Sequence, residues 1–173
     1  WDPPREAARR FNWRDLPLQE GYPGSPDKCL EILETKPHHW KQWFLGEARF
    51  AFEVPPEFVP AETTADRIRE VNAMVHAENE LIDEAIGQVT DYLKNRGWDD
   101  ETEIIFTTDH GEFQGDFGML FKGPYHIEAL MHVPLIWHPA PSRDISPLAI
   151  SNPVGHNECE WRGDNFGPPL QVP

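Results

Sequence analysis

The most regular pattern of hydrophobic and polar positions lies between residues 64 and 96. Apolar residues recur there at helical spacing, at Ile68, Val71, Val75, Ile82, Ala85, Ile86, Val89 and Leu93. This spacing predicts one long helix over 65–96. Thr63 and Asp66 resemble a capping box at its start, and Gly97 is placed as its C-terminal stop. The opposite side, which we interpret as a solvated face, carries Glu78, Glu80, Asp83 and Glu84.

Two short apolar runs follow this helix, "EIIFTT" at 103–108 and "HVPLIW" at 132–137. Their apolar residues are consecutive rather than alternating, which is typical of strands buried on both faces of a parallel sheet. The intervening "YHIEALM" favours a helical turn or two. The order of long helix, buried strand, loop and buried strand predicts an α/β fold. We expect both strands to lie in one sheet with the helix packed on it.

The remaining sequence offers no other convincing strand. A sheet of two strands is marginally stable on its own. We therefore expect this chain to be a fragment of a larger α/β sheet, which a second chain or a missing segment would complete.

Residues 1–60 combine turn signals with a high aromatic content. They hold half of the chain's 18 prolines, together with Trp1, Trp13, Tyr22, Trp40 and Trp43. This composition indicates an excursion ordered by packing rather than a disordered segment. A short helix is predicted over 26–35, with Pro26 near its start. We divide the chain into this excursion at 1–60, the helix, strand and loop part at 61–156, and a tail at 157–173.

The composition excludes some classes of binding partner but does not indicate a cellular compartment. The formal net charge is −15, which does not attract nucleic acid or an anionic membrane. No apolar run approaches the ~20 residues of a membrane span. Cys29 and Cys159 form neither a disulfide framework nor a CxxC metal site. A signal peptide is absent, but the chain begins at Trp1 rather than at a methionine, so the cytoplasm is only slightly favoured.

Candidate chemistry gathers in "TTDHGEFQGDFGMLFKGP", residues 107–124, directly after the first strand. Ligands of open α/β sheets sit beyond the carboxyl ends of strands, where Asp109 and His110 lie. A carboxylate oxygen and an imidazole nitrogen together suit a divalent metal, and Lys122 adds a charge for an anionic oxygen. Three glycines let the backbone turn tightly, Gly111, Gly115 and Gly118. The residues alone leave two readings open, a metal-and-anion site or a polar turn in which Asp109 caps backbone amides.

The longer stretch "TTDHGEFQGDFGMLFKGPYHIEALMHVPLIW" resembles the C-terminal metal-binding motif of the sulfatases, in the alkaline phosphatase superfamily. The segments "FKGPYH" and, upstream, "WDPP" are most similar to the branch of phosphonate monoester hydrolases and phosphodiesterases. The resemblance runs from Trp1 to about His156. It implies an alkaline-phosphatase-like sandwich, with a mostly parallel central sheet and helices on both faces.

The resemblance also implies roles for individual residues. Asp109 and His110 resemble two ligands of the catalytic metal, Mn²⁺ or Ca²⁺, and the nitrogen ligand tilts the choice toward a metal that tolerates it. Lys122 resembles the lysine that contacts the transferred sulfate or phosphate group. Glu112 and Asp116 match the motif without a defined chemical role.

The sequence also departs from the family pattern. The family nucleophile is a formylglycine made within Cys/Ser-x-Pro-Ser-Arg, whereas "PAPSR" at 139–143 has Pro139 at the required position. The acidic ligands of the family's N-terminal strand are missing, and the tail after "PVGH" diverges. We expect a metal-dependent hydrolase of small sulfate, phosphate or phosphonate esters, without its nucleophile-bearing part and inactive in isolation. The complete protein is expected to be a homo-oligomer, and a noncatalytic metal- or anion-binding module is the alternative.

The other histidines are weaker candidates. His76 is expected to be a half-buried polar residue of the long helix rather than a ligand. His126 and His132 flank the predicted short helix, and a supporting role near the site stays open for either. His156 could approach the site, as a histidine at that place does in the family.

Overall fold

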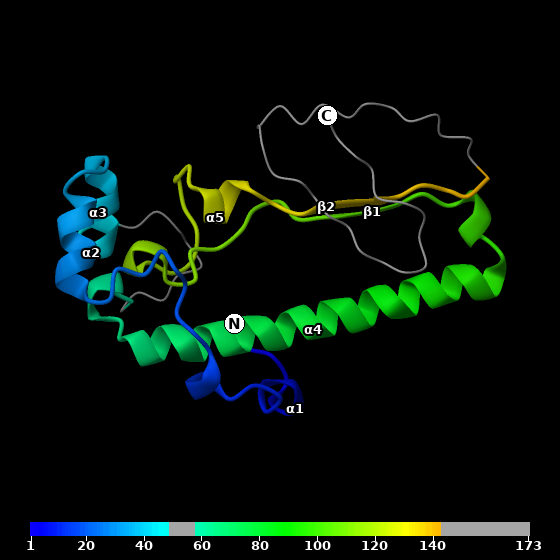
Figure 1. The fold of residues 1–173 in the computed structure, drawn as a ribbon, viewed down its shortest axis with the longest axis horizontal. Coiled ribbons are helices and arrows are strands. Elements are labelled where there is room, and N and C mark those ends of the chain that lie inside the picture. The colour runs from blue at the N-terminus through cyan, green and yellow to red at the C-terminus, as the bar shows by residue number, and fades with distance from the viewer. Residues whose placement is uncertain (49–57, 143–173) are drawn as a thin grey trace.

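The structure is a computed structural model that describes residues 1–48 and 58–142 (Figure 1). Its α-helices are α1 Arg5–Ala8, α2 Pro26–Leu33, α3 His38–Phe44, α4 Ala65–Arg96 and α5 Glu128–Met131, and its strands are β1 Ile104–Thr107 and β2 Leu135–His138. Single 3₁₀ turns occur at Trp13–Asp15, Pro60–Glu62, Asp99–Glu101 and Asp116–Gly118. Figure 1 shows α2 and α3 grouped near the start of α4, and the β1–β2 ribbon running along the rest of α4.

The predicted long helix is confirmed as α4, but its cap differs from the expectation. Thr64 is the N-cap, because its hydroxyl accepts from the backbone N–H of Arg67 at 3.1 Å. Thr63 instead donates its hydroxyl to the carbonyl of Val59. Gly97 ends the helix in the left-handed region at φ 67°, as the sequence predicted.

Only the first half of α4 is buried. The buried residues of the helix are Ile68, Val71, Asn72, Ala73 and Ala77. Further along the same apolar stripe, Ile82 is 50% exposed and Val89 is 61% exposed. The helical periodicity was therefore right, but the second half of the stripe is only partly covered within the described structure.

The two predicted strands pair in one sheet, as expected, with slightly shifted bounds. They run antiparallel, with Ile104 opposite His138 and Thr107 opposite Leu135. The parallel arrangement is wrong for this pair, since the chain reverses through the loop between the strands instead of crossing over a helix. A mostly parallel central sheet stays a prediction, because such sheets can carry an antiparallel strand.

The expected burial of the strands on both faces is not observed. Ile105 is 61% exposed and Leu135 is 67% exposed. Although α4 lies along the ribbon in Figure 1, Ile82 and Val89 do not bury themselves against it. The prediction that the helix packs on the sheet is therefore not met by these side chains.

The core of the described residues lies where α2 and α3 meet the loop after β1. Its buried members include Leu33, Trp40, Trp43, Phe44, Phe113, Met119, Tyr125 and Leu130. The predicted short helix at 26–35 is confirmed as α2, with Pro26 in its first turn and the Ser25 hydroxyl accepting from Lys28 N. The sequence missed α3, whose run of His, Trp and Phe residues has low helix propensity and is held by packing.

The three-part division of the chain stays a prediction, and the tail at 157–173 lies outside the described residues. Within residues 1–48 and 58–142, no helix combines the length and hydrophobicity needed to cross a membrane.

Candidate functional site

Asp109 begins the loop that leaves β1, and its carboxylate organises the turn. Its Oδ1 accepts from the backbone N–H of His110 at 3.0 Å and from the Thr108 hydroxyl at 3.3 Å. The side chain remains 84% exposed. The capping contact expected for a polar strand-end turn is therefore present, and it leaves Oδ2 free of these two bonds.

His110 is held in one tautomer by its neighbour. Its Nδ1 lies 2.8 Å from the carbonyl oxygen of Gly111, which can only accept, so Nδ1 carries a proton. Its Nε2 lies 2.7 Å from the Lys122 ammonium nitrogen, which can only donate. Nε2 therefore presents its lone pair, the form in which an imidazole binds a metal.

The three predicted site residues are brought together by the fold. Lys122 Nζ contacts His110 Nε2, and Asp109 Oδ2 lies 3.6 Å from the same nitrogen. The pKa of the Asp109 carboxyl is lowered, chiefly by electrostatic interaction with His110 and further by the donors of the turn. Their convergence is a feature of the structure, while their roles as metal ligands and anion contact stay predictions.

The described residues supply only part of a metal site. Asp109 Oδ2 and His110 Nε2 converge closely enough to serve one ion, and the oxygen and nitrogen pair fits a divalent metal. Yet within the two described ranges, no group of three or more His, Cys, Asp or Glu side chains is arranged to hold a metal. Structural and catalytic metals need at least three protein ligands or several oxygen donors. The described residues therefore bring no third His, Cys, Asp or Glu side chain to Asp109 and His110.

Close packing explains two of the glycines in the loop. A Cβ on Gly111 would lie 1.9 Å from the Ala129 carbonyl oxygen, and the Gly111 N–H donates to Leu130 O at 3.0 Å. Gly118 has φ +73°, and a Cβ there would lie 2.6 Å from the sulfur of buried Cys29. Glycine is therefore required at both positions by contacts with α5 and α2.

A hairpin folds the loop back toward β1. Phe113 N–H donates to Phe121 O at 2.9 Å, and Gly115 N–H donates to Met119 O at 2.8 Å. These bonds bring residue 121 opposite residue 113, so Lys122 returns to His110. Trp1 stacks on Phe121 with ring centroids 4.4 Å apart, so the chain's first residue also reaches this loop.

The loop has anchors that sequence reasoning missed. Asn72 of α4 donates its Nδ2 to the Gln114 carbonyl at 3.1 Å, and Gln19 donates its Nε2 to Gln114 Oε1 at 3.2 Å. The sequence feature that could have indicated this contact is Asn72, a single asparagine among the apolar positions of the predicted helix.

Asp116, which matched the family motif without a defined role, packs against residue 21. A Cβ on Gly21 would lie 2.3 Å from Asp116 Oδ1. Burial raises the pKa of the Asp116 carboxyl, and the backbone N–H of Gly21 partly opposes this shift by donating to the carboxylate. Asp116 therefore serves the loop's packing rather than the cluster formed by Asp109, His110 and Lys122.

The other candidate histidines lie elsewhere. His76 is exposed rather than half-buried and stacks on Phe11, with centroids 5.5 Å apart. His126 is exposed, and His132 contacts Glu128 through Nδ1. His156 lies outside the described residues.

Comparison with known proteins places these residues in a family. Residues 37–158 match the family model of the sulfatases, and this range contains α3, α4, both strands and the whole loop. The chain belongs to the sulfatase family. The resemblance seen in the motif around Asp109, His110 and Lys122 is therefore confirmed at the level of the family.

Two relatives of this sulfatase-family chain carry more specific names. The multifunctional alkaline phosphatase superfamily protein PehA of Trinickia caryophylli is 46% identical over 55 residues, which cover 32% of this chain and 10% of PehA. The crystal structure of phosphonate monoester hydrolase of Agrobacterium radiobacter is similar with a TM-score of 0.63 and 26% identity, over 78% of this chain and 25% of that one. The likeness supports an α/β fold, and the chain spans a quarter or less of either relative.

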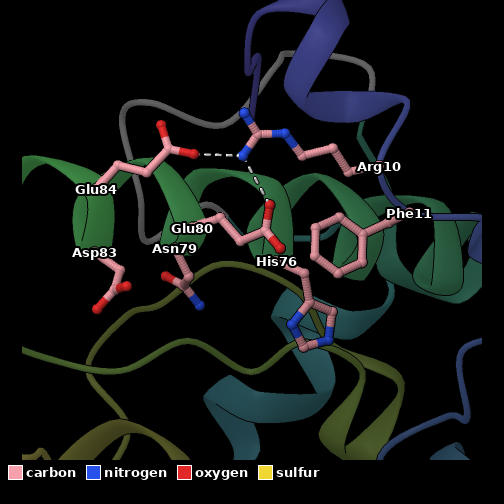
Figure 2. A pocket seen from close by; sticks show the side chains of 7 residues that line it. All are labelled: Arg10, Phe11, His76, Asn79, Glu80, Asp83 and Glu84. Carbon is pink, nitrogen blue, oxygen red and sulfur yellow. Dashed lines mark hydrogen bonds and ion pairs between the residues drawn. The ribbon is translucent and has the colours of Figure 1, made fainter.

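The sulfatase-family chain also has a pocket between residues 10–11 and the middle of α4 (Figure 2). Its volume is about 510 Å³, and its lining consists of Arg10, Phe11, His76, Asn79, Glu80, Asp83 and Glu84. Arg10 bridges Glu80 and Glu84 at 2.9 and 2.7 Å, and these hydrogen bonds raise the pKa of Arg10. The acidic face of α4 is thus partly covered by residues 1–11 rather than fully solvated.

Proposed function

We propose that this chain forms part of the catalytic domain of a metal-dependent hydrolase of sulfate, phosphate or phosphonate esters. The observation that carries the proposal is the convergence of Asp109, His110 and Lys122 at the end of β1. Membership of the sulfatase family supports the ester class. The names of the two relatives favour phosphate and phosphonate esters among the possible substrates.

In this proposal Asp109 and His110 hold one divalent metal. The Gly111 carbonyl fixes the imidazole so that Nε2 faces the same side as Asp109 Oδ2. A nitrogen ligand beside a carboxylate favours Mn²⁺, while the oxygen-rich remainder of such a site would also serve Ca²⁺. The bound ion would polarise a nonbridging oxygen of the ester.

Lys122 is proposed as the contact to the anionic group of the substrate. In the structure its ammonium donates to His110 Nε2, which has a single lone pair. An ammonium has three N–H donors, so Lys122 can also donate to an anionic oxygen bound beside His110. A positive charge held there stabilises the charge that develops on the equatorial oxygens of the transferred group.

The nucleophile and the remaining metal ligands are proposed to come from another segment or a second chain. A formylglycine is expected there, because no Cys/Ser-x-Pro-Ser-Arg occurs in this sequence. The exposed apolar side chains of Ile105, Leu135 and Ile136 would give that other segment or chain an apolar surface to cover. The substrate is proposed to be a small anionic ester, and the complete enzyme a homo-oligomer.

The second candidate function is a noncatalytic metal- or anion-binding module of the same fold. The observation that favours it is that residues 1–48 and 58–142 bring only Asp109 and His110 together as His, Cys, Asp or Glu donors, where catalytic metals need more ligands. Such a module would bind the ion or the anion without turnover.

The deciding experiment compares Asp109→Ala with Asp91→Ala in the complete protein that carries these residues. Asp91 is an exposed carboxylate of α4 and serves as the matched control. The proposed hydrolase should lose bound metal and turnover of aryl phosphonate, bis-aryl phosphate and aryl sulfate only in Asp109→Ala. Metal binding without turnover in the unaltered protein would favour the noncatalytic module, and unchanged metal content in Asp109→Ala would contradict a metal site at Asp109 in either function. The 173-residue chain alone should show no turnover with Mn²⁺ or Ca²⁺.

A further inference from the structure

Asn72 is unusual among the residues that α4 buries. Within residues 1–48 and 58–142 it is the only polar or charged residue that is buried, with 2% of its surface exposed. Its neighbours on the buried face are apolar, among them Ile68 and Val71. A leucine of similar shape would satisfy this packing, so the amide calls for another explanation.

The amide makes one hydrogen bond and leaves its other half unsatisfied. Nδ2 donates to the carbonyl of Gln114 at 3.1 Å, while buried Oδ1 has no hydrogen-bond partner in the described part of the chain. An unpartnered polar atom in apolar surroundings lowers stability. What the amide contributes that a hydrocarbon could not is therefore the contact to Gln114.

Gln114 occupies a backbone conformation that needs support. Its φ is +49°, in the left-handed region that residues other than glycine rarely adopt. Asn72 holds its carbonyl, and Gln19 holds its side-chain oxygen at 3.2 Å. Such conformations persist where surrounding contacts determine them.

Gln114 is connected to Lys122 through the hairpin of the loop. Residue 114 sits between Phe113 and Gly115, whose N–H groups donate to Phe121 and Met119 in the hairpin. Residue 121 directly precedes Lys122, whose Nζ reaches His110 Nε2 at 2.7 Å. Two backbone hydrogen bonds therefore connect the segment around Gln114 with the segment that carries Lys122.

We propose that Asn72 is the positioning residue of the Lys122–His110 pair. By fixing the Gln114 carbonyl to α4, it sets the loop conformation that brings the ammonium to the imidazole. The proposal rests on the proposed function for the chemical use of that pair, but not for the geometry that the test measures.

The test is nuclear magnetic resonance of the full 173-residue chain labelled with ¹⁵N, at neutral pH and with a chelator present. The ammonium protons of Lys122 give a signal while they are held in a hydrogen bond and lose it to exchange with water when released. Lys122→Arg assigns the signal. Asn72→Leu removes the bond to Gln114 at nearly constant shape. Val71→Ala is the matched control, because it creates a cavity in the same cluster and leaves that bond in place.

We expect the wild type and Val71→Ala to retain the Lys122 signal. Asn72→Leu should raise its exchange rate with water by about fivefold or more, the factor that corresponds to losing one hydrogen bond. Its urea midpoint should stay near that of the wild type, because removing the unpartnered Oδ1 offsets the loss of the bond to Gln114. If Asn72 served only for packing, Asn72→Leu would lower the urea midpoint. The exchange rate of the Lys122 protons would then be unchanged at urea concentrations below that midpoint.

Three results would overturn the proposal: no Lys122 signal in the wild type, unchanged exchange in Asn72→Leu, or a loss of stability as large as that of Val71→Ala. If Asn72→Leu does not fold, the test uses the exchange rates of the side-chain amide protons in the wild type. The Asn72 amide should exchange more slowly than that of exposed Asn95 on the same helix, and equal rates would overturn the proposal. Because no turnover is measured, a failed hydrolase assay and a failed positioning role are distinguishable.

Discussion

The Lys122 ammonium nitrogen lies 2.7 Å from His110 Nε2, although twelve positions separate the two residues in the sequence. The contact exists because a hairpin between Phe113 and Phe121 reverses the chain, and because the Gly111 carbonyl orients the imidazole. One polar cluster thereby gathers a cation, an imidazole lone pair and the Asp109 carboxylate. The predictions that follow test this cluster and the packing that surrounds it.

Lys122→Ala in the complete protein should lower kcat of the proposed hydrolysis by roughly 10²- to 10³-fold, the usual loss when a group that stabilises transition-state charge is removed. Metal content, measured by atomic emission, should stay near normal, because the lysine is proposed to contact substrate rather than metal. Lys94→Ala, which removes an exposed lysine from the end of α4, is the control. Equal turnover in the two variants would assign Lys122 to the surface of the loop.

Gly111→Ala should destabilise the chain by about 2 kcal/mol or more, because the new Cβ would meet the Ala129 carbonyl oxygen at 1.9 Å and backbone cannot yield cheaply. Gly87→Ala is the matched control. No atom lies within 4 Å of the added Cβ there, and the helix interior of α4 should gain about 0.5–1 kcal/mol. Urea denaturation measures both, and a stable Gly111→Ala chain would contradict the close contact with α5.

Asp116→Asn should stabilise the chain at neutral pH and have little effect in acid. Burial raises the pKa of Asp116 above its unfolded value, so the folded state binds this proton more tightly than the unfolded state. The stability linked to protonation is therefore gained as the pH falls through the raised pKa and is absent above it. The asparagine stays uncharged at every pH and keeps an oxygen that can accept from Gly21.

Thermal unfolding of Asp116→Asn and of the wild type, followed from neutral pH downward, checks this sign. The advantage of the variant should shrink as the pH falls. Asp91→Asn, at an exposed position of α4, controls for the loss of net charge. An advantage that grows in acid would mean that the Gly21 contact outweighs the effect of burial.

Ile68→Ala and Ile82→Ala make the same change at two positions of α4 and should differ widely. Ile68 is fully buried, and its truncation should cost about 2–5 kcal/mol. Ile82 is 50% exposed, and its truncation should cost about 0.5 kcal/mol or less in the 173-residue chain. Calorimetry of the two variants compares them. Equal losses would show that the second half of the helix is covered in solution.

The sequence by itself determined the local elements of this protein. Helix α4, helix α2, the two strands and the motif around Asp109, His110 and Lys122 follow from periodicity, capping residues and motif spacing, which depend on neighbours a few positions apart. The motif also pointed to the sulfatase family, and the match over residues 37–158 confirmed it.

Only the tertiary structure decided how these elements meet. The antiparallel pairing of β1 with β2, the exposure of Ile82 and Leu135, the meeting of Lys122 with His110 and the bond from Asn72 to Gln114 all join distant segments. An apolar stripe indicates that a helix can be buried, but not which part of it will be. Burial depends on which other segments of the fold pack against each part of the helix. Asn72 in that stripe became informative only once the loop lay against it.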